Sequence, residues 1–180
     1  MSRKLRASME DTVVATSRAM APLRGGRAST DLVNHIRVSA YGSKMPVEQV
    51  ATVSVTGPRT LVVAPYDDST AGEMRTALEA ANLGATPVLD GAIIRINLPK
   101  PSGDRRLELK KLAKAEAEKG RISLRNTRRD AINSARRAAK SGEIPEGKKN
   151  RQEKEISELC DEYIKRIDEV LTNVLRDLDS

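Results

Sequence analysis

The chain has 180 residues, of which 32% are charged and only 2% aromatic, with no Trp and no Phe. A core without large rings has to be built from aliphatic side chains, which suits helix bundles better than β-sandwiches. The net charge of +7 favours a polyanionic partner, and the absence of any run of 18 apolar residues predicts no membrane-spanning segment.

The first segment is predicted to be a helix because its apolar side chains recur at steps of three and four. Pro22 lies near its end and should distort the last turn. Gly25 and Gly26 are expected to stop the helix. The predicted apolar stripe comprises Leu5, Met9, Val13, Thr16, Met20 and Leu23.

The middle of the chain is predicted to be a small α+β unit. Six of the eight prolines lie between Pro46 and Pro101, and short alternating or apolar runs are bounded by Gly or Pro. A helix is expected from Ser69, as N-cap, to Asn82, with Gly84 as its stop. The expected strands are residues 35–40, 51–55, 60–64 and 92–97.

Two long helices are predicted for the rest of the chain, separated by a turn at residues 141–145. Gly120 interrupts the first of them and should cost about 1 kcal/mol relative to alanine. The expected apolar side of the first helix comprises Leu109, Leu112, Leu124, Thr127, Ala131, Ser134 and Ala138. That of the second comprises Ile156, Leu159, Tyr163, Ile167, Val170, Val174 and Leu178.

Three apolar helical stripes predict a three-helix bundle with the small unit inserted after its first helix. The fold class is therefore expected to be α+β. Residues 1–27 and 102–180 should form the bundle, and residues 28–101 the inserted β/α/β domain.

A set of basic residues, which we name the cationic face, falls within an arc of roughly 120° on the helix predicted for residues 103–141. It comprises Arg106, Lys110, Lys114, Arg121, Arg125, Arg128 and Arg136. Arginine suits paired contacts with phosphate oxygens, so this face is chemically suited to binding an RNA backbone. Residues 142–180 carry a net charge of −4, so a solvated face balanced by a neighbouring acidic helix stays open as the alternative.

Catalytic and metal-binding patterns are missing from the sequence. His35 is the one histidine, and Cys160, the one cysteine, is expected to be a packing residue and favours a reducing compartment. Residues 142–148 match the start of a phosphate-binding loop, but Lys149 follows where Ser or Thr is needed. A coiled-coil scaffold and a hydrolase acting on RNA or nucleotides stay open as rival functions.

Several motifs resemble those of ribosome recycling factors, in the family's order and spacing over nearly the whole chain. The most specific are residues 24–29 (RGGRAS) and residues 124–131 (LRNTRRDA). Others are Tyr41-Gly42, Pro46, residues 49–51 (QVA), residues 59–61 (RTL), residues 82–84 (NLG) and residues 94–99 (IRINLP).

This resemblance implies an L-shaped pair of domains, acting as a cytoplasmic monomer that is not an enzyme and uses no cofactor of its own. Such a factor binds the post-termination ribosome between its subunits, with the bundle along large-subunit rRNA. Elongation factor G, using GTP, then drives subunit separation. The resemblance implies rRNA binding by Arg106, Arg125, Arg128, Arg129 and Arg27. It implies a hinge at Arg27, Ala28, Ser29, Lys100, Pro101 and Ser102.

The linkers depart from the family's pattern. Gly25 stands where the family has Thr, Thr30 where it has Pro, and Pro99-Lys100-Pro101-Ser102 differs from the usual entry to the long helix. The angle and flexibility of the hinge are therefore left open by the resemblance.

Overall fold

A computed structural model describes residues 3–180 and divides the chain into two compact units. The helical unit comprises the described residues up to Gly25 together with Gly103–Ser180, and the inserted unit is Gly26–Ser102. The sequence places these boundaries at 27/28 and 101/102, within two residues of those found from contacts. Within residues 3–180, no helix combines the length and apolar character needed to cross a membrane.

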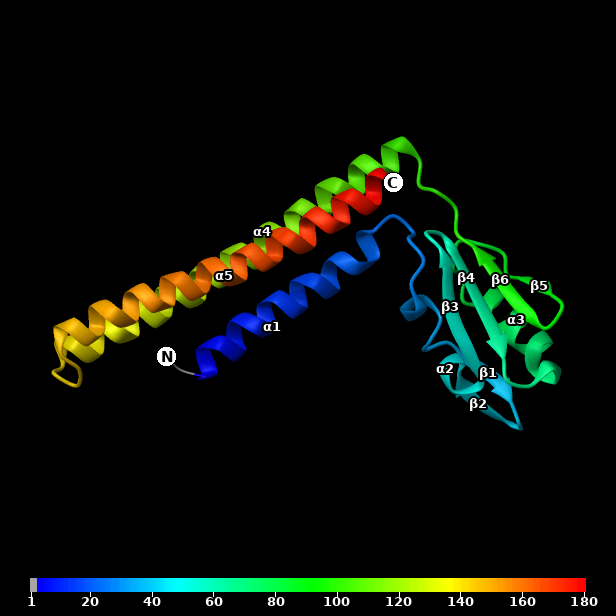
Figure 1. The fold of residues 1–180 in the computed structure, drawn as a ribbon, viewed down its shortest axis with the longest axis horizontal. Helices are drawn as coiled ribbons and strands as arrows, with labels where there is room; N and C mark the ends of the chain where they lie inside the picture. The colour runs from blue at the N-terminus through cyan, green and yellow to red at the C-terminus, as the bar shows by residue number, and fades with distance from the viewer. Residues whose placement is uncertain (1–2) are drawn as a thin grey trace. The chain divides into compact units, whose positions relative to one another are not determined.

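The helical unit consists of α1 (Arg3–Met20), α4 (Gly103–Lys140) and α5 (Glu146–Asp179), and the α+β class with a three-helix bundle is confirmed. Figure 1 shows α4 and α5 lying side by side for most of their length, with α1 beside them. Pro22 lies in a 3₁₀ turn, η1 (Ala21–Leu23), that follows α1, as the sequence indicates. The turn after α4 contains Gly142 in a left-handed conformation, with φ of +82°.

The core of the helical unit differs from the prediction on α4. Leu112, expected on the apolar side, is 43% exposed, and the buried stripe of this helix is made largely of small residues. That stripe comprises Leu109, Ala113, Ala117, Gly120, Leu124 and Ala135. Small side chains are needed because α1 and α5 both pack closely against this part of α4.

Gly120 shows how close that approach is. A Cβ atom at this position would lie 2.5 Å from Thr16 Oγ1 on α1 and 2.8 Å from Ile167 Cδ1 on α5. Gly120, which the sequence predicts only to weaken the helix, is therefore the residue that allows the three helices to pack closely.

The inserted unit contains a four-stranded antiparallel sheet in the order β3-β4-β6-β5, and a separate hairpin of β1 and β2. The sheet strands are β3 (Ala51–Gly57), β4 (Thr60–Pro65), β5 (Val88–Asp90) and β6 (Ile93–Asn97). The hairpin strands are β1 (Arg37–Ala40) and β2 (Ser43–Pro46), and the helices are α2 (Val47–Val50) and α3 (Ala71–Ala80). Short 3₁₀ turns are η2 (Thr30–Leu32) and η3 (Asp68–Thr70).

One apolar core holds the inserted unit together. Leu61 pairs with Ile96 and Val63 with Ile94 across β4 and β6, and all four are fully buried. Met74 and Leu78 of α3 belong to the same cluster. The predicted strands at 35–40, 51–55, 60–64 and 92–97 and the helix from Ser69 are found, with ends shifted by a few residues.

Three elements of this unit, β2, α2 and β5, are absent from the prediction. The predicted N-cap is also wrong, because Ser69 lies inside η3, and the N-cap of α3 is Thr70, whose side chain makes no capping hydrogen bond. The Asp67 carboxylate is the capping group instead, accepting from the Ser69 backbone N–H at 3.0 Å. This hydrogen bond lowers the pKa of Asp67.

Candidate nucleic-acid interface

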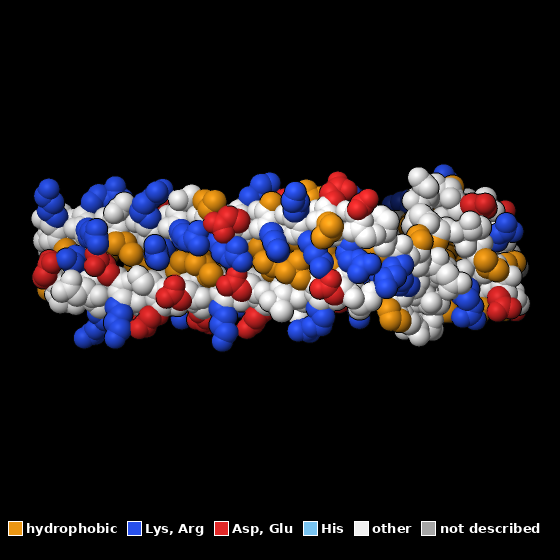
Figure 2. Space-filling view, turned by 90° about the horizontal axis from the view of Figure 1, so that it is seen from above, with side chains coloured by type: hydrophobic (Ala, Val, Ile, Leu, Met, Phe, Trp, Pro, Cys, Tyr) orange, Lys and Arg blue, Asp and Glu red, His pale blue; other side chains and the backbone are white. Residues whose placement is uncertain are grey.

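The cationic face is carried by one unbroken helix. The 38 residues of α4 extend for about 57 Å, so the spacing predicted for a straight helix applies to all seven basic residues. Figure 2 shows Lys and Arg side chains distributed along the helical unit, with Asp and Glu side chains among them and hydrophobic atoms between. This surface is therefore cationic but not uniformly so.

Part of α4 forms a hollow of about 330 Å³, which we name the arginine hollow. No acidic side chain lines it, and its arginines and asparagines occupy neighbouring turns of the helix. The lining comprises Arg125, Asn126, Arg128, Arg129, Ile132, Asn133 and Arg136. A concave surface with several guanidinium groups is chemically suited to phosphate oxygens.

The predicted rRNA-binding residues fall in three places. Arg125, Arg128 and Arg129 lie together in the arginine hollow. Arg106 lies 19 residues before Arg125 on the same helix, which is about 28 Å along the axis. Arg27 belongs to the inserted unit and is exposed.

Ion pairs with α5 neutralise part of the cationic face. Lys110 Nζ lies 2.5 Å from an Asp179 oxygen, and Arg136 Nε lies 2.5 Å from a Glu153 oxygen. The Lys110 ammonium lowers the pKa of the Asp179 carboxyl. The alternative of a balanced, solvated face therefore describes these positions.

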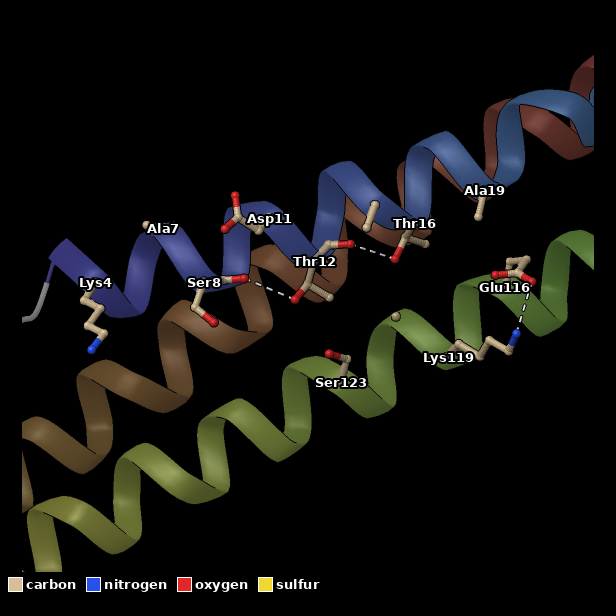
Figure 3. A pocket seen from close by; sticks show the side chains of 12 residues that line it. Lys4, Ala7, Ser8, Asp11, Thr12, Thr16, Ala19, Glu116, Lys119 and Ser123 are labelled. Atoms are coloured by element: carbon tan, nitrogen blue, oxygen red, sulfur yellow. Dashed lines mark hydrogen bonds and ion pairs between the residues drawn. The ribbon is translucent and has the colours of Figure 1, made fainter.

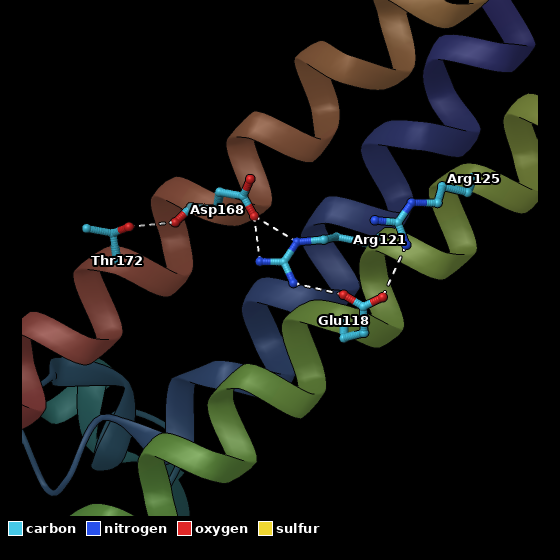
Figure 4. Close-up of polar contacts among 5 residues, drawn as sticks. All are labelled: Glu118, Arg121, Arg125, Asp168 and Thr172. Carbon is cyan, nitrogen blue, oxygen red and sulfur yellow. Dashed lines mark hydrogen bonds and ion pairs between the residues drawn. The ribbon is translucent and has the colours of Figure 1, made fainter.

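A second group of ion pairs surrounds Arg121 (Figure 4). Its guanidinium contacts Asp168 of α5 at 2.6 Å and Glu118 of α4 at 3.0 Å. The other Glu118 oxygen lies 3.1 Å from Arg125 Nη1. Hydrogen bonds from Arg121 and then Arg125 lower the pKa of Glu118, so this carboxylate stays ionised at neutral pH.

Three other members of the face lack a short contact of this kind, although the positive charge of Arg106 contributes to lowering the pKa of Asp179. Among residues 3–180, no hydrogen bond or ion pair is found for the side chains of Arg106, Lys114 or Arg128. The Arg106 Nε is buried without a hydrogen-bond partner. Arg129 is two-thirds exposed and makes a long contact of 3.9 Å with Asp130. The half-buried, unpaired Arg128 and the exposed, weakly paired Arg129 are therefore available to an incoming anion without breaking a short internal contact.

Cys160 is fully buried in the helical core, where its thiol donates to the Leu124 carbonyl oxygen at 3.6 Å. Burial raises the pKa of this thiol, and the positive charge of Arg128 opposes the rise. A buried neutral thiol is inert, in agreement with the packing role predicted for it.

The loop-like motif at residues 142–148 is a turn between two helices. Lys149, at the position where a phosphate-binding loop needs Ser or Thr, has its ammonium on the Glu146 carboxylate. Pro145 is the N-cap of α5, so the segment starts a helix after another helix and not after a strand.

A larger groove of about 670 Å³ lies between α1 and α4 (Figure 3). Its lining mixes small residues with both signs of charge, including Lys4, Asp11, Glu116 and Lys119. Glu116 and Lys119 neutralise each other at 3.4 Å. This groove therefore lacks the single-sign charge that a phosphate backbone requires.

The linker residues are anchored to the inserted unit. The Ala28 backbone N–H donates to Pro58 O at 2.8 Å, and the Leu98 N–H donates to Arg59 O at 2.7 Å. Both linkers thus meet the turn between β3 and β4. Just outside them, Gly25 and Gly26 have φ of +74° and +75°, a region that glycine enters at little cost.

Sequence reasoning missed several residues of this surface. Asn133 and Ile132 line the arginine hollow, and Glu118 lies within the arc of the cationic face. Helical spacing from Arg125 and Arg129 would have found all three, because positions three, four and seven apart share a face.

Three helices with an exposed cationic face, interrupted by an inserted sheet unit, define a basic helical-bundle protein with an arginine-lined hollow. The family model for ribosome recycling factor matches residues 16–178. The chain belongs to the ribosome recycling factor family.

Relatives at the sequence level are similar over nearly their whole length. The ribosome-recycling factor of Nostoc sp. is 38% identical over 172 residues, covering 96% of this chain and 94% of that protein. The ribosome-recycling factor of Rubrobacter xylanophilus is 40% identical over 163 residues, covering 91% and 88%.

Solved structures agree with this. The solution structure of a ribosome recycling factor has a TM-score of 0.74 at 30% identity, covering 98% of this chain and 94% of that one. A second match comes from the models for the T. thermophilus ribosome recycling factor and the E. coli elongation factor G bound to the E. coli post-termination complex. It has a TM-score of 0.65 at 32% identity and covers 97% and 95% of the two chains.

Proposed function

We propose that this protein recycles ribosomes after termination. It binds the post-termination ribosome between the subunits, with α4 along large-subunit rRNA, and promotes subunit dissociation together with elongation factor G and GTP. Membership of the ribosome recycling factor family supports this proposal, as does the relative described with elongation factor G on the post-termination complex.

The proposed action needs no catalytic residue in this chain. Elongation factor G supplies the free energy from GTP, and this protein supplies a rigid helical grip and a second unit on which force can act. Its place of action is the cytoplasm, where post-termination ribosomes are. The grip comes from guanidinium–phosphate contacts, which position a protein on RNA without reading its bases.

The hinge is proposed to lie where the chain passes between the units. Because Ala28 and Leu98 are tied to the turn between β3 and β4, bending has to occur outside them. We propose that the chain bends at Gly25–Arg27 on one linker and at Lys100–Ser102 on the other, where it passes from one unit to the next. Residues 28 and 29, predicted as part of the hinge, then move with the inserted unit.

Arg128 is the single residue on which this proposal depends most. It lines the arginine hollow, and no hydrogen bond or ion pair holds its guanidinium among residues 3–180. The resemblance to the family at residues 124–131 (LRNTRRDA) implies that this residue contacts rRNA.

The test is the breakdown of polysomes by purified elongation factor G and GTP, with and without this chain. Arg128→Ala should weaken ribosome binding about tenfold, the loss expected for one charge-assisted contact, and slow subunit splitting accordingly. Arg137→Ala is the matched control, since residue 137 is nine positions on and faces the opposite side of α4. Arg137 is exposed and outside the hollow.

Salt dependence separates an RNA grip from protein–protein docking. Ribosome affinity should fall steeply from low to moderate salt, and Arg128→Ala should reduce the slope by about 1. A flat salt response would favour docking onto ribosomal protein. Polysome breakdown that is unchanged by adding the chain would refute the proposed function, and normal splitting by Arg128→Ala would refute the role of that residue.

A further inference from the structure

Glu118 lies among the arginines of the cationic face and forms ion pairs with two of them. Its two carboxylate oxygens are divided between Arg121 at 3.0 Å and Arg125 at 3.1 Å (Figure 4). Two guanidinium groups that converge on one anion, each through a different oxygen, are arranged as they would be around a phosphate. An anion of the protein itself therefore fills a position suited to an RNA phosphate.

The two arginines differ in the ion-pair contacts that they would retain if Glu118 were displaced. Arg121 also contacts Asp168 of α5, through Nε at 2.8 Å and Nη2 at 2.6 Å, and its side chain is only 20% exposed. For Arg125, which is 46% exposed, Glu118 is the one ion-pair partner found within residues 3–180. Arg125 is thus the guanidinium that can be transferred to an external anion.

We propose that Glu118 is a built-in competitor of the RNA phosphate for Arg125, and that it limits how tightly α4 holds ribosomal RNA. This inference rests on the proposed function and concerns the same surface. A phosphate approaching Arg125 has to displace the carboxylate and then remain near its negative charge, which weakens binding. A factor that acts on many ribosomes in turn has to leave each one, so weaker binding favours repeated rounds.

The test compares Glu118→Gln with Glu116→Gln in the full-length protein. Both substitutions remove one negative charge from α4 and keep the size of the side chain. Residue 116 is two positions away, about 200° around the helix, and its carboxylate lies in the groove between α1 and α4, paired with Lys119 (Figure 3). Equal changes in net charge are thus placed on opposite faces.

The affinity for purified ribosomes should rise about threefold in Glu118→Gln, as expected when an exposed ion pair no longer competes. The slope of log affinity against log salt should steepen by up to about 1, because the charge of Arg125 then acts on the phosphate alone and is not shared with Glu118. Glu116→Gln should match the unsubstituted protein in both measurements. Under multiple-turnover conditions, polysome breakdown by Glu118→Gln should slow, while a single round should proceed at the normal rate.

Weaker binding by Glu118→Gln would overturn the inference, because it would show that Glu118 positions Arg125 for RNA. An equal rise in both variants would also overturn it, since net charge alone would then explain the effect. Thermal unfolding of both variants checks that neither result comes from a damaged bundle. If the unsubstituted protein fails to bind ribosomes, the proposed function fails, and the inference fails with it.

Discussion

The two units of the molecule differ in charge. The inserted unit, Gly26–Ser102, carries seven basic and seven acidic residues, so the whole net charge of +7 belongs to the helical unit. Some ion pairs of the helical unit join separate helices, as between Arg166 and Glu10, and others lie within one helix, as between Arg121 and Glu118. Those found in the inserted unit, such as Arg75–Glu79, connect near neighbours. The excess positive charge that favours a polyanionic partner therefore lies in the helical unit.

Their cores differ as well. The inserted unit buries branched side chains such as Leu61, Val63 and Ile96, which fill the space between a sheet and a helix. The helical unit buries Ala117 and Gly120 at the centre of α4, where helix backbones come close together. A gain in side-chain volume should consequently harm the bundle most at these positions.

The largest effect on stability is expected for Gly120→Ala. An added Cβ would meet Thr16 Oγ1 at 2.5 Å and Ile167 Cδ1 at 2.8 Å, and such overpacking costs about 1 to 3 kcal/mol. The gain in helix propensity is only about 1 kcal/mol, so the free energy of unfolding should fall. Urea unfolding followed by circular dichroism measures the change.

Gly147→Ala is the matched control for that substitution. Residue 147 lies in α5 and nothing is within 4 Å of a Cβ placed there, so the same change should leave stability equal or raise it by up to about 1 kcal/mol. Adding Thr16→Ala to Gly120→Ala should recover part of the loss. A stabilised Gly120→Ala protein would show that helix propensity, and not close packing, dominates at this position.

The inserted unit offers a smaller effect of opposite sign at Tyr41. Tyr41 and Gly42 form the two-residue turn between β1 and β2, with φ of +53° and +78°, which is the pattern of a type I′ turn. Tyrosine is unfavourable in this left-handed region and its side chain is 64% exposed, so little packing offsets the strain. Tyr41→Asn should therefore stabilise the hairpin by about 0.5 to 1 kcal/mol.

Gly42→Ala tests the same turn from the other side. A φ of +78° is strained for alanine, so this variant should lose stability although nothing lies within 4 Å of the added Cβ. Equal stability of both variants and the unsubstituted protein, in thermal unfolding of the whole chain, would contradict the turn assignment.

The sequence predicted helices and strands well where the spacing of apolar residues within one element was enough to identify it. The three bundle helices and the strands around Val38, Leu61 and Ile94 follow from spacing, because their burial is decided by one face of one element. The strand β2 was missed because its residues, Ser43–Pro46, are exposed or half-buried and have no alternation. Its position depends on the Tyr41–Gly42 turn, whose first residue is not one that usually marks such a turn.

The candidate site was predictable only in part. Helical spacing placed Arg125 and Arg128 on one face of α4 without any knowledge of their neighbours. It could not show that Asp168, 47 residues after Arg121, would lie against that arginine. Which cations are neutralised depends on the register between α4 and α5. That register is set by packing in the core between the helices, and the residue spacing within a single helix gives no information about it.

The smallest effect is expected for the exposed ion pair between α1 and α5. Both Glu10 oxygens accept from Arg166, one of them at 2.8 Å from Nη2, and the guanidinium lies 5.0 Å from the centre of the Tyr163 ring. Glu10→Gln should lower Tm slightly at neutral pH, as exposed pairs generally do. Asp11→Asn is the control, because no hydrogen bond or ion pair is found for Asp11 among residues 3–180.

The pH dependence of that small effect identifies its source. The hydrogen bond from Arg166 holds the pKa of Glu10 below its ordinary value of 4.5, so the folded state favours the ionised carboxyl. This stabilisation is present above pH 4.5 and is lost as pH falls through the lowered pKa of the folded state. The difference in Tm between the unsubstituted protein and Glu10→Gln should therefore shrink below pH 4.5 and disappear once Glu10 is protonated. A difference in Tm that persists at lower pH would mean that the amide introduced by Glu10→Gln disturbs packing, because a protonated Glu10 no longer forms an ion pair with Arg166.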